Sequence, residues 1–421
     1  MHKRSVKWLC YAVAAGLFLG LAFTAATSLQ AAPAKEKPVK KVTTRVLGAN
    51  DRINLAFIGN GMQFLGLLQR GFQPRKDKKG DFEYAAMCDV WDPRVKNAQQ
   101  KTKSEKTCRD YREVIARPDI DGVVIAVPDH WHYVIAREAL LSGKDVYLEK
   151  PMTYTIDEAA KLNDLVNQTK RILQVGGSGV TTRLYWKVNE YIKAGKMGKV
   201  LWGLISYNRN TDAGIWDYPI PGVGSEAWPN AEFSEKNCDW KMWLGPARKR
   251  PLSAERYFRW RKYWDYSGEY YINMISCMGN QESAPISIYG NWGTLQIVQE
   301  RMQAGDAMGD QARPRGGRPG REIAVIKAER TFLNKFKEAN DGKTEVTIEP
   351  VENEDLADNW LNSMRSREKP AYDSLKGYQV MAAIKLGVES YREGRVMTFD
   401  PGSRRLVAKV LERKVYLPPG A

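Results

Sequence analysis

Two short segments carry the side chains best suited to chemistry, and each follows an apolar run typical of a buried strand. Pro128-Asp129-His130-Trp131-His132 follows residues 123–127, and Glu149-Lys150-Pro151 follows residues 145–148. Ligands bind outside the carboxyl ends of strands in an open parallel sheet, so both segments are expected at one ligand-binding edge. A lysine desolvated beside a positive group gives up its proton more readily. Lys150 is therefore a candidate acid or base, and a solvated strand-end charge is the alternative.

A second candidate site begins the folded region. Residues 54–58 are predicted to form a buried strand that runs into Gly59-Asn60-Gly61, and a helix is predicted over residues 62–70. Glycines at such a turn let the backbone approach a pyrophosphate at the helix N-terminus. Phe64 replaces the third glycine of the GxGxxG pattern, so we expect it to push the helix from the strand or to narrow the phosphate site. A plain strand–turn–helix is the alternative.

An acidic residue ends the next predicted strand, residues 84–88. Asp89 would accept the ribose hydroxyls of a dinucleotide and repel a 2′-phosphate, which favours NAD over NADP. A helix N-cap before Asp92-Pro93 is the alternative role. The spacing from Gly59 exceeds the usual about 20 residues. Residues 73–81, QPRKDKKGD, account for the excess and are predicted to form a solvated basic loop.

The remaining pattern alternates strands and helices. Helices are predicted over residues 132–141, 156–169, 184–194, 358–367 and 378–392, and further strands over residues 171–175 and 199–207.

Several motifs resemble one family closely. VPDHWH at residues 127–132, SGKDVYLEKP at 142–151 and TIDEAAKL at 155–162 are similar to the Gfo/Idh/MocA oxidoreductases, over roughly residues 52–401. The resemblance implies an N-terminal Rossmann dinucleotide-binding domain followed by an α/β domain with a large open, mostly antiparallel sheet. In that family the EKP lysine assists proton transfer or orients a sugar hydroxyl near the nicotinamide, and its bond to proline is often cis. The resemblance thus makes Lys150 the catalytic residue.

The resemblance also implies a set of NAD-binding residues, while a metal site is not expected because the cysteines lack ligand spacing. His132 either contacts cofactor or caps its helix, and His130 is expected to be structural. Relatives usually have glycine where this chain has Met62. The expected cofactor contacts are Gly59, Asn60, Gly61, Met62, Asp89, Pro128, His132, Glu149 and Lys150.

One family motif is missing. After Gly268, relatives continue with a helix bearing the histidine that is the usual acid/base partner of the EKP lysine. This chain passes directly to residues 269–273, EYYIN, and its three histidines are His2, His130 and His132. The C-terminal domain therefore looks shortened, either in a diverged, catalytically weak binder or by an internal deletion. Loss of an acid/base group typically removes about 10² to 10⁴ of the rate.

Length and composition limit the number of domains and the classes of partner that we expect. At 421 residues two domains are expected. We predict an export signal over residues 1–31, a flexible linker over 32–51, an NAD(P)-binding Rossmann domain over 52–177 and a C-terminal substrate and oligomerisation domain over 178–421. Residues 8–26 are uncharged, so an uncleaved membrane anchor is the alternative to export to the periplasm or the outside. The net charge of +16 comes without a recognisable nucleic-acid module, so nucleic acid is not an expected partner.

These observations favour an exported NAD-dependent oxidoreductase acting on a sugar or sugar derivative, with a homo-oligomer implied by the family. Aromatic segments such as residues 258–266, FRWRKYWDY, suit the faces of sugars, although packing under a long loop explains any single tryptophan equally well. Two alternatives remain: an NAD-dependent glycosidase of the same family, and a catalytically impaired pseudoenzyme that binds cofactor or glycan.

Overall fold

The computed structural model describes residues 48, 51–177, 182–204, 217–220, 231–268, 285–301, 320–351 and 354–408. The predicted export signal, most of the linker and the 269–273 segment at the missing motif lie outside these ranges. Within them, no helix is long and apolar enough to cross a membrane.

The N-terminal part is a six-stranded parallel sheet with the order β3-β2-β1-β4-β5-β6, the doubly wound arrangement of a Rossmann domain. Its strands read as near-continuous apolar runs because both faces are covered. The strands are β1 (Ile53–Ile58), β2 (Phe82–Cys88), β3 (Thr107–Cys108), β4 (Gly122–Ile125), β5 (Asp145–Glu149) and β6 (Leu173–Gly176). The helices between them are α4 (Asp92–Thr102), α5 (Tyr111–Ile115), α6 (His132–Leu141) and α7 (Ile156–Thr169).

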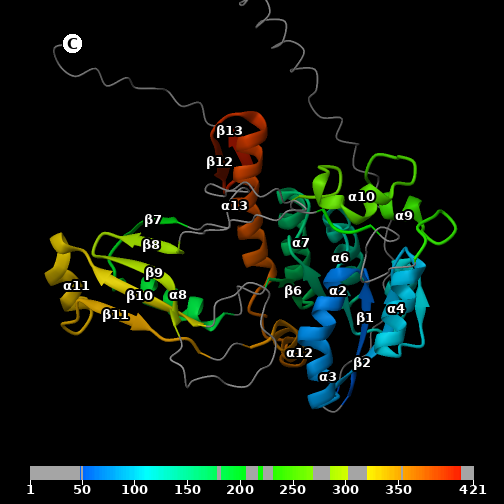
Figure 1. The fold of residues 1–421 in the computed structure, drawn as a ribbon, viewed down its shortest axis with the longest axis horizontal. Helices are drawn as coiled ribbons and strands as arrows, with labels where there is room; N and C mark the ends of the chain where they lie inside the picture. The colour runs from blue at the N-terminus through cyan, green and yellow to red at the C-terminus, as the bar shows by residue number, and fades with distance from the viewer. Residues whose placement is uncertain are drawn as a thin grey trace, which may run out of the picture. The chain divides into compact units, whose positions relative to one another are not determined.

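The helical region after β1 corrects one prediction. The chain continues from α2 (Met62–Leu67) through a π-helical turn, η2 (Leu68–Phe72), into α3 (Gln73–Lys79), and these follow one another as one rod (Figure 1). The predicted solvated loop at residues 73–81 is therefore wrong. Three lysines in the last turn of α3 suit the negative helix end, and Gly80 closes it with φ +61°.

A helix from the C-terminal half completes the Rossmann core. Trp360, on α12 (Leu356–Ser366), is fully buried, and its ring centroid lies 5.8 Å from that of Tyr147 on β5 and 6.3 Å from that of Phe72. A Cβ at Gly122 would lie 3.0 Å from the Trp360 ring, so β4 approaches α12 closely. The sheet face beside α2 and α3 is thus sealed by α12, whose Asp358 lies 283 positions after Arg75 of α3 (Figure 1).

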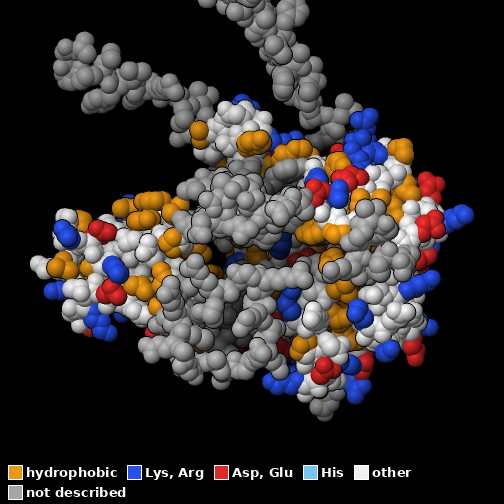
Figure 2. Space-filling view, viewed as in Figure 1, with side chains coloured by type: hydrophobic (Ala, Val, Ile, Leu, Met, Phe, Trp, Pro, Cys, Tyr) orange, Lys and Arg blue, Asp and Glu red, His pale blue; other side chains and the backbone are white. Residues whose placement is uncertain are grey.

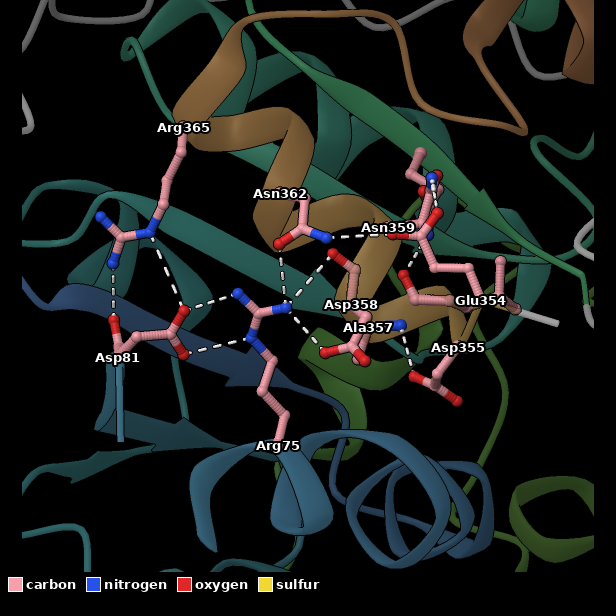
Figure 3. Close-up of polar contacts among 11 residues, drawn as sticks. Arg75, Asp81, Glu354, Asp355, Ala357, Asp358, Asn359, Asn362 and Arg365 are labelled. Carbon is pink, nitrogen blue, oxygen red and sulfur yellow. Dashed lines mark hydrogen bonds and ion pairs between the residues drawn. The ribbon is translucent and has the colours of Figure 1, made fainter. Parts of the chain in front are cut away.

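A buried arginine fixes α12 to α3. The side chain of Arg75 is 2% exposed, and its Nη2 donates to Asp81 Oδ2 at 2.5 Å while Nη1 donates to Asp358 Oδ1 at 2.7 Å. Nη1 also lies 3.1 Å from Asn362 Oδ1, and Arg365 donates to the Asp81 carbonyl at 3.0 Å. Figure 3 shows Arg75 reaching between Asp81 and α12. The guanidinium is buried with its charge compensated on both sides.

The part of the second sheet that the structure describes has five antiparallel strands in the order β11-β10-β9-β8-β7. Leu184 and Val188 of α8 and Phe336 of α11 are buried in its core with Leu295 and Ile326. The strands are β7 (Val200–Leu204), β8 (Ser287–Gly290), β9 (Gly293–Arg301), β10 (Gly320–Ala328) and β11 (Glu345–Ile348), and the helices are α8 (Arg183–Lys193) and α11 (Leu333–Ala339). The predicted fold class, a Rossmann domain with a mostly antiparallel second sheet, is confirmed.

The remaining elements frame the site or follow it. A long helix, α13 (Ser374–Glu393), packs against α7, and its Lys385 donates to the Gly268 carbonyl at 2.8 Å. Two short helices, α9 (Trp240–Leu244) and α10 (Ala254–Phe258), carry an aromatic cluster described below. The ribbon β12 (Met397–Asp400) and β13 (Arg405–Ala408) follows α13. Figure 2 shows Lys and Arg side chains interspersed with Asp and Glu side chains on the visible face.

Replacing the buried arginine tests its role. Arg75→Met should lower the free energy of unfolding by about 2 to 3 kcal/mol, because Asp81 and Asp358 lose their partner. The loss is limited because both carboxylates remain partly exposed to solvent. The matched control is Arg52→Met, since Arg52 pairs with Glu83 with 66% of its side chain exposed and should cost less than about 1 kcal/mol. Urea unfolding of both variants measures the difference, and equal losses would contradict this role.

The same pair predicts a pH dependence. Burial disfavours the ionised form of Asp81, but the hydrogen bonds from Arg75 outweigh it and hold the pKa of Asp81 below its usual 3.8. A carboxyl whose pKa is lower in the folded state contributes stability above its unfolded pKa and loses it as pH falls through the folded pKa. Unfolding midpoints measured from pH 6 to pH 3 should therefore fall less steeply for Arg75→Met than for the unchanged chain.

Candidate dinucleotide site

The turn after β1 requires glycine. Gly59 has φ +88°, and a Cβ there would lie 2.5 Å from the Ala126 carbonyl oxygen at the end of β4. No side chain fits against a backbone atom at that distance, so the chain can pass β4 only at a glycine. The next residue, Asn60, is 1% exposed. This turn sits at the carboxyl edge of the sheet, as predicted.

Phe64, the replacement for the third glycine, is buried under α2. Its exposed fraction is 1%, and its ring meets Phe57 of β1 edge-on with centroids 5.6 Å apart. An aromatic layer therefore separates the helix from the strand where a glycine would allow direct contact. Met62, at the first position of α2, is 58% exposed.

Asp89 joins three parts of the site. Its Oδ2 accepts a hydrogen bond from the Asn60 backbone N–H at 2.7 Å, and its Oδ1 accepts from the Trp91 N–H at 3.0 Å and from the Tyr257 hydroxyl at 3.2 Å. The carboxylate is 6% exposed. The N-cap of α4 is Trp91, without a side-chain cap bond, so the N-cap alternative for Asp89 is wrong. Its contact with a ribose stays a prediction.

A pocket with about 490 Å³ of open space lies at this edge. The carboxyl ends of β1, β2 and β4 form its floor, and residues from α9 and α10 form its aromatic wall. Its charged groups are Asp89, Arg94 and Arg109, beside the largely apolar surface that suits an adenosine. The lining consists of Ile58, Gly59, Cys88, Asp89, Val90, Arg94, Arg109, Tyr111, Ala126, Val127, Pro128, Trp131, Ile135, Met242, Trp243 and Tyr257.

The aromatic wall is rigid. Tyr257 is 1% exposed, and Trp243 stacks on Trp240 with ring centroids 4.6 Å apart and planes at 9°. Trp131, from the predicted PDHWH segment, donates from Nε1 to the Trp243 carbonyl at 2.8 Å. Such packing holds the wall without help from a ligand. The aromatic residues at 240–266 thus mostly pack on one another, as the structural alternative expected.

Sequence reasoning missed several residues of this pocket, among them Arg94 and Tyr257. Arg94 lies in the first turn of α4, and its guanidinium donates to the Tyr257 hydroxyl at 2.9 Å. Tyr257 is separated from Asp89 by 168 positions. A basic residue five positions after a strand-end acid was a signal for Arg94. Tyr257 left none, because a long connection alone brings it to the site.

The EKP segment follows β5, two strands along from β1. The Lys150-Pro151 bond is cis, as the family resemblance implied. Lys150 is half-buried, and its backbone N–H lies 3.2 Å from Glu149 Oε2, while Glu149 is 6% exposed. The structure thus brings Gly59, Asp89 and Pro128 to this pocket and places Glu149 and Lys150 further along the same edge.

Both histidines make structural contacts in this geometry, and a contact of His132 with the cofactor stays a prediction. His132 is 1% exposed, with Nδ1 2.6 Å from the Pro151 carbonyl oxygen and Nε2 2.9 Å from that of Val127. It ties the loop after β4 to the EKP segment, and α6 has no side-chain cap bond, so the capping role is wrong. His130 contacts the Trp243 carbonyl at 3.0 Å, and burial lowers its pKa to about 4, as a structural role predicts.

Comparisons with known proteins agree with this geometry. Residues 53–177 match the family model of Gfo/Idh/MocA proteins, described as "Oxidoreductase family, NAD-binding Rossmann fold". A "Glycosyl hydrolase family 109 protein" from Shewanella sp. (strain W3-18-1) is 27% identical over 263 residues, covering 60% of this chain and 52% of that protein. The "scyllo-inositol 2-dehydrogenase (NAD(+))" of Bacillus subtilis (strain 168) is 30% identical over 141 residues, 33% of this chain and 41% of that enzyme.

Solved structures support the fold. An oxidoreductase from Bacillus subtilis matches with a TM-score of 0.50 at 14% identity, covering 86% of this chain and all (100%) of that one. Another from Klebsiella pneumoniae matches with a TM-score of 0.50 at 17% identity, covering 84% and 98%. Identities this low bear on the fold alone. The chain spans about half the length of the first curated relatives.

The glycine turn yields a testable contrast. Gly59→Ala combines a positive φ with a backbone clash at 2.5 Å, so the turn must move. The matched control is Gly195→Ala, where φ is +72° but nothing lies within 4 Å of the added Cβ. The control should cost about 1 to 2 kcal/mol in free energy of unfolding, and Gly59→Ala clearly more. Thermal unfolding compares them, and an equal cost would contradict the close approach of the turn to β4.

Proposed function

Because residues 53–177 match the Gfo/Idh/MocA oxidoreductase family, we propose that the chain is an exported NAD-dependent oxidoreductase acting on a sugar or sugar derivative. The observation that carries the proposal is the carboxylate of Asp89, which is buried at the end of β2 and held against the Gly59 turn by the Asn60 N–H at 2.7 Å. That arrangement puts an acceptor for ribose hydroxyls beside a turn that brings the backbone close to a pyrophosphate.

The residues present fit a dinucleotide. The backbone of Gly59, Asn60 and Gly61 would face the pyrophosphate, and Asp89 would accept the ribose hydroxyls of the adenosine end. Pro128 lines the same pocket, and Met62, Glu149 and Lys150 would border the path toward the nicotinamide. A bound nicotinamide supplies hydride acceptance or donation.

Lys150 is the proposed catalytic residue. Its position after β5, half-buried beside the buried Glu149, suits an amine that holds a substrate hydroxyl and moves its proton. His132, bonded to the Pro151 carbonyl at 2.6 Å, would position the segment without touching substrate. Because the sequence holds no histidine beyond residue 132, a second acid/base histidine in the C-terminal half is excluded. We therefore expect slow turnover.

A glycosidase is the second candidate. The relatives that match over 60% of this chain are named glycosyl hydrolase family 109 proteins. The same dinucleotide site and the same Lys150 would serve a reaction in which a sugar carbon is transiently oxidised before the glycosidic bond breaks. Release of a leaving group from an aryl glycoside with catalytic NAD would favour this reading, and net NADH formation from free sugars would favour the first.

We also propose a homo-oligomer formed through the second sheet. Among the described strands β7 lies at the edge of the second sheet, and its Leu201 and Trp202 are 61% and 53% exposed. Exposed apolar edge strands are normally covered by another strand or chain. Tyr289 stacks on Trp202 with centroids 4.2 Å apart, which extends the apolar surface onto β8.

Dinucleotide binding is the first prediction of this proposal. The chain should bind NADH saturably, and Asp89→Asn should raise the Kd about tenfold or more, because the charged acceptor for the ribose hydroxyls is lost. Asp157→Asn removes an exposed carboxylate at the start of α7 and should leave the Kd unchanged. NADH fluorescence titration measures all three. A well-folded chain that does not bind NADH would reject the oxidoreductase and glycosidase readings together.

The catalytic assignment has its own test. Lys150→Ala should abolish turnover of any sugar that the unchanged chain oxidises, while the Kd for NADH changes by less than about threefold. Absorbance at the NADH band follows turnover, and fluorescence titration follows binding. Lys161→Ala, on α7, is the matched control and should retain turnover. Unchanged turnover in Lys150→Ala would remove Lys150 from the chemistry.

A further inference from the structure

The guanidinium of Arg94 covers the second glycine of the turn. A Cβ added to Gly61 would lie 3.1 Å from Arg94 Cζ, 3.3 Å from Nη1 and 3.4 Å from Nη2. In dinucleotide-binding turns this second glycine lets the backbone approach the pyrophosphate. Arg94 therefore places a positive, planar group at the point where a phosphate would approach.

The aromatic wall holds this guanidinium in place. Nη1 donates to the Tyr257 hydroxyl at 2.9 Å, and Cζ lies 4.7 Å from the centroid of the Tyr257 ring. Cζ also lies 5.6 Å from the Phe258 ring and 5.7 Å from the Trp91 ring. Cation–π contacts and one hydrogen bond fix the plane of the group, so little side-chain entropy remains to be lost on binding a ligand.

The neighbouring groups favour an anion at this point. The glycine turn itself is degraded, because Phe64 replaces its third glycine. The first turn of α2 contains no acidic residue that would repel a phosphate. Asp89 is engaged by Asn60, Trp91 and Tyr257. Arg109 also lines the pocket, but it is paired with Asp92 at 2.5 Å. A guanidinium presents five donors in a planar fork that matches phosphate oxygens.

We propose that Arg94 is a ligand-binding residue that neutralises a phosphate group of the bound dinucleotide and so compensates for the degraded glycine turn. The proposal rests on the proposed function, since it concerns the same pocket. Two phosphates share this chemistry: the pyrophosphate, present in NADH and NADPH, and the 2′-phosphate, present in NADPH alone.

The test compares two cofactors and three variants by fluorescence titration. Arg94→Gln should raise the Kd about 10- to 100-fold, the value of one charge-assisted hydrogen-bonded contact. Lys96→Gln, which removes an exposed charge from the same helix, should change it less than twofold. Arg94→Lys keeps the charge but lacks the planar set of donors, so its Kd should lie between those of the other two variants. Thermal unfolding checks that each variant is folded.

Each outcome has one meaning. Equal weakening of NADH and NADPH by Arg94→Gln assigns the contact to the pyrophosphate, and weakening of NADPH alone assigns it to the 2′-phosphate. Unchanged Kd values in folded Arg94→Gln, or an equal loss in Lys96→Gln, overturn the inference while leaving dinucleotide binding intact. Binding of neither cofactor by the unchanged chain overturns the proposed function itself.

Discussion

The carboxylate of Asp89 is the group on which the geometry of the site depends. It is buried at the end of β2, where an unpaired charge would be costly, and its oxygens accept hydrogen bonds from the turn after β1, from its own loop and from Tyr257. One side chain therefore holds together three segments that lie apart in the sequence. The same hydroxyl of Tyr257 then holds Arg94 against Gly61. A negative and a positive group are fixed in this way beside the glycine turn.

The parallel sheet that carries this site depends on the C-terminal half of the chain for part of its core. Trp360 fills the core below β4 and β5, and the Arg75 network ties α12 to α3. A Rossmann sheet needs both faces covered, and α12 supplies cover that residues 52–177 do not. The parallel sheet and α12 are thus expected to unfold as one cooperative unit.

Sequence patterns predicted helices well where the apolar residues recurred with a clear period and where proline or a capping residue marked the start of the helix. The helices at 132–141 and 156–169 match α6 and α7, because Pro128 and the Thr155 capping box mark their starts. Residues 73–81 were misassigned because seven of the nine are charged or proline, and Asp358, the partner that fixes the buried Arg75 to α12, lies 283 positions away. Asp89 was found from its strand-end position. Tyr257 was not, since local patterns contain no information on long-range contacts.

Hydrogen exchange of backbone amides with and without NADH would test most directly whether the dinucleotide occupies this pocket. Bound NADH should slow exchange at residues 58–62, 88–94 and 254–258, the segments joined by Asp89, and leave β9 and β10 unchanged. Protection at the second sheet alone, or binding without any change in these three segments, would contradict a dinucleotide site organised around Asp89.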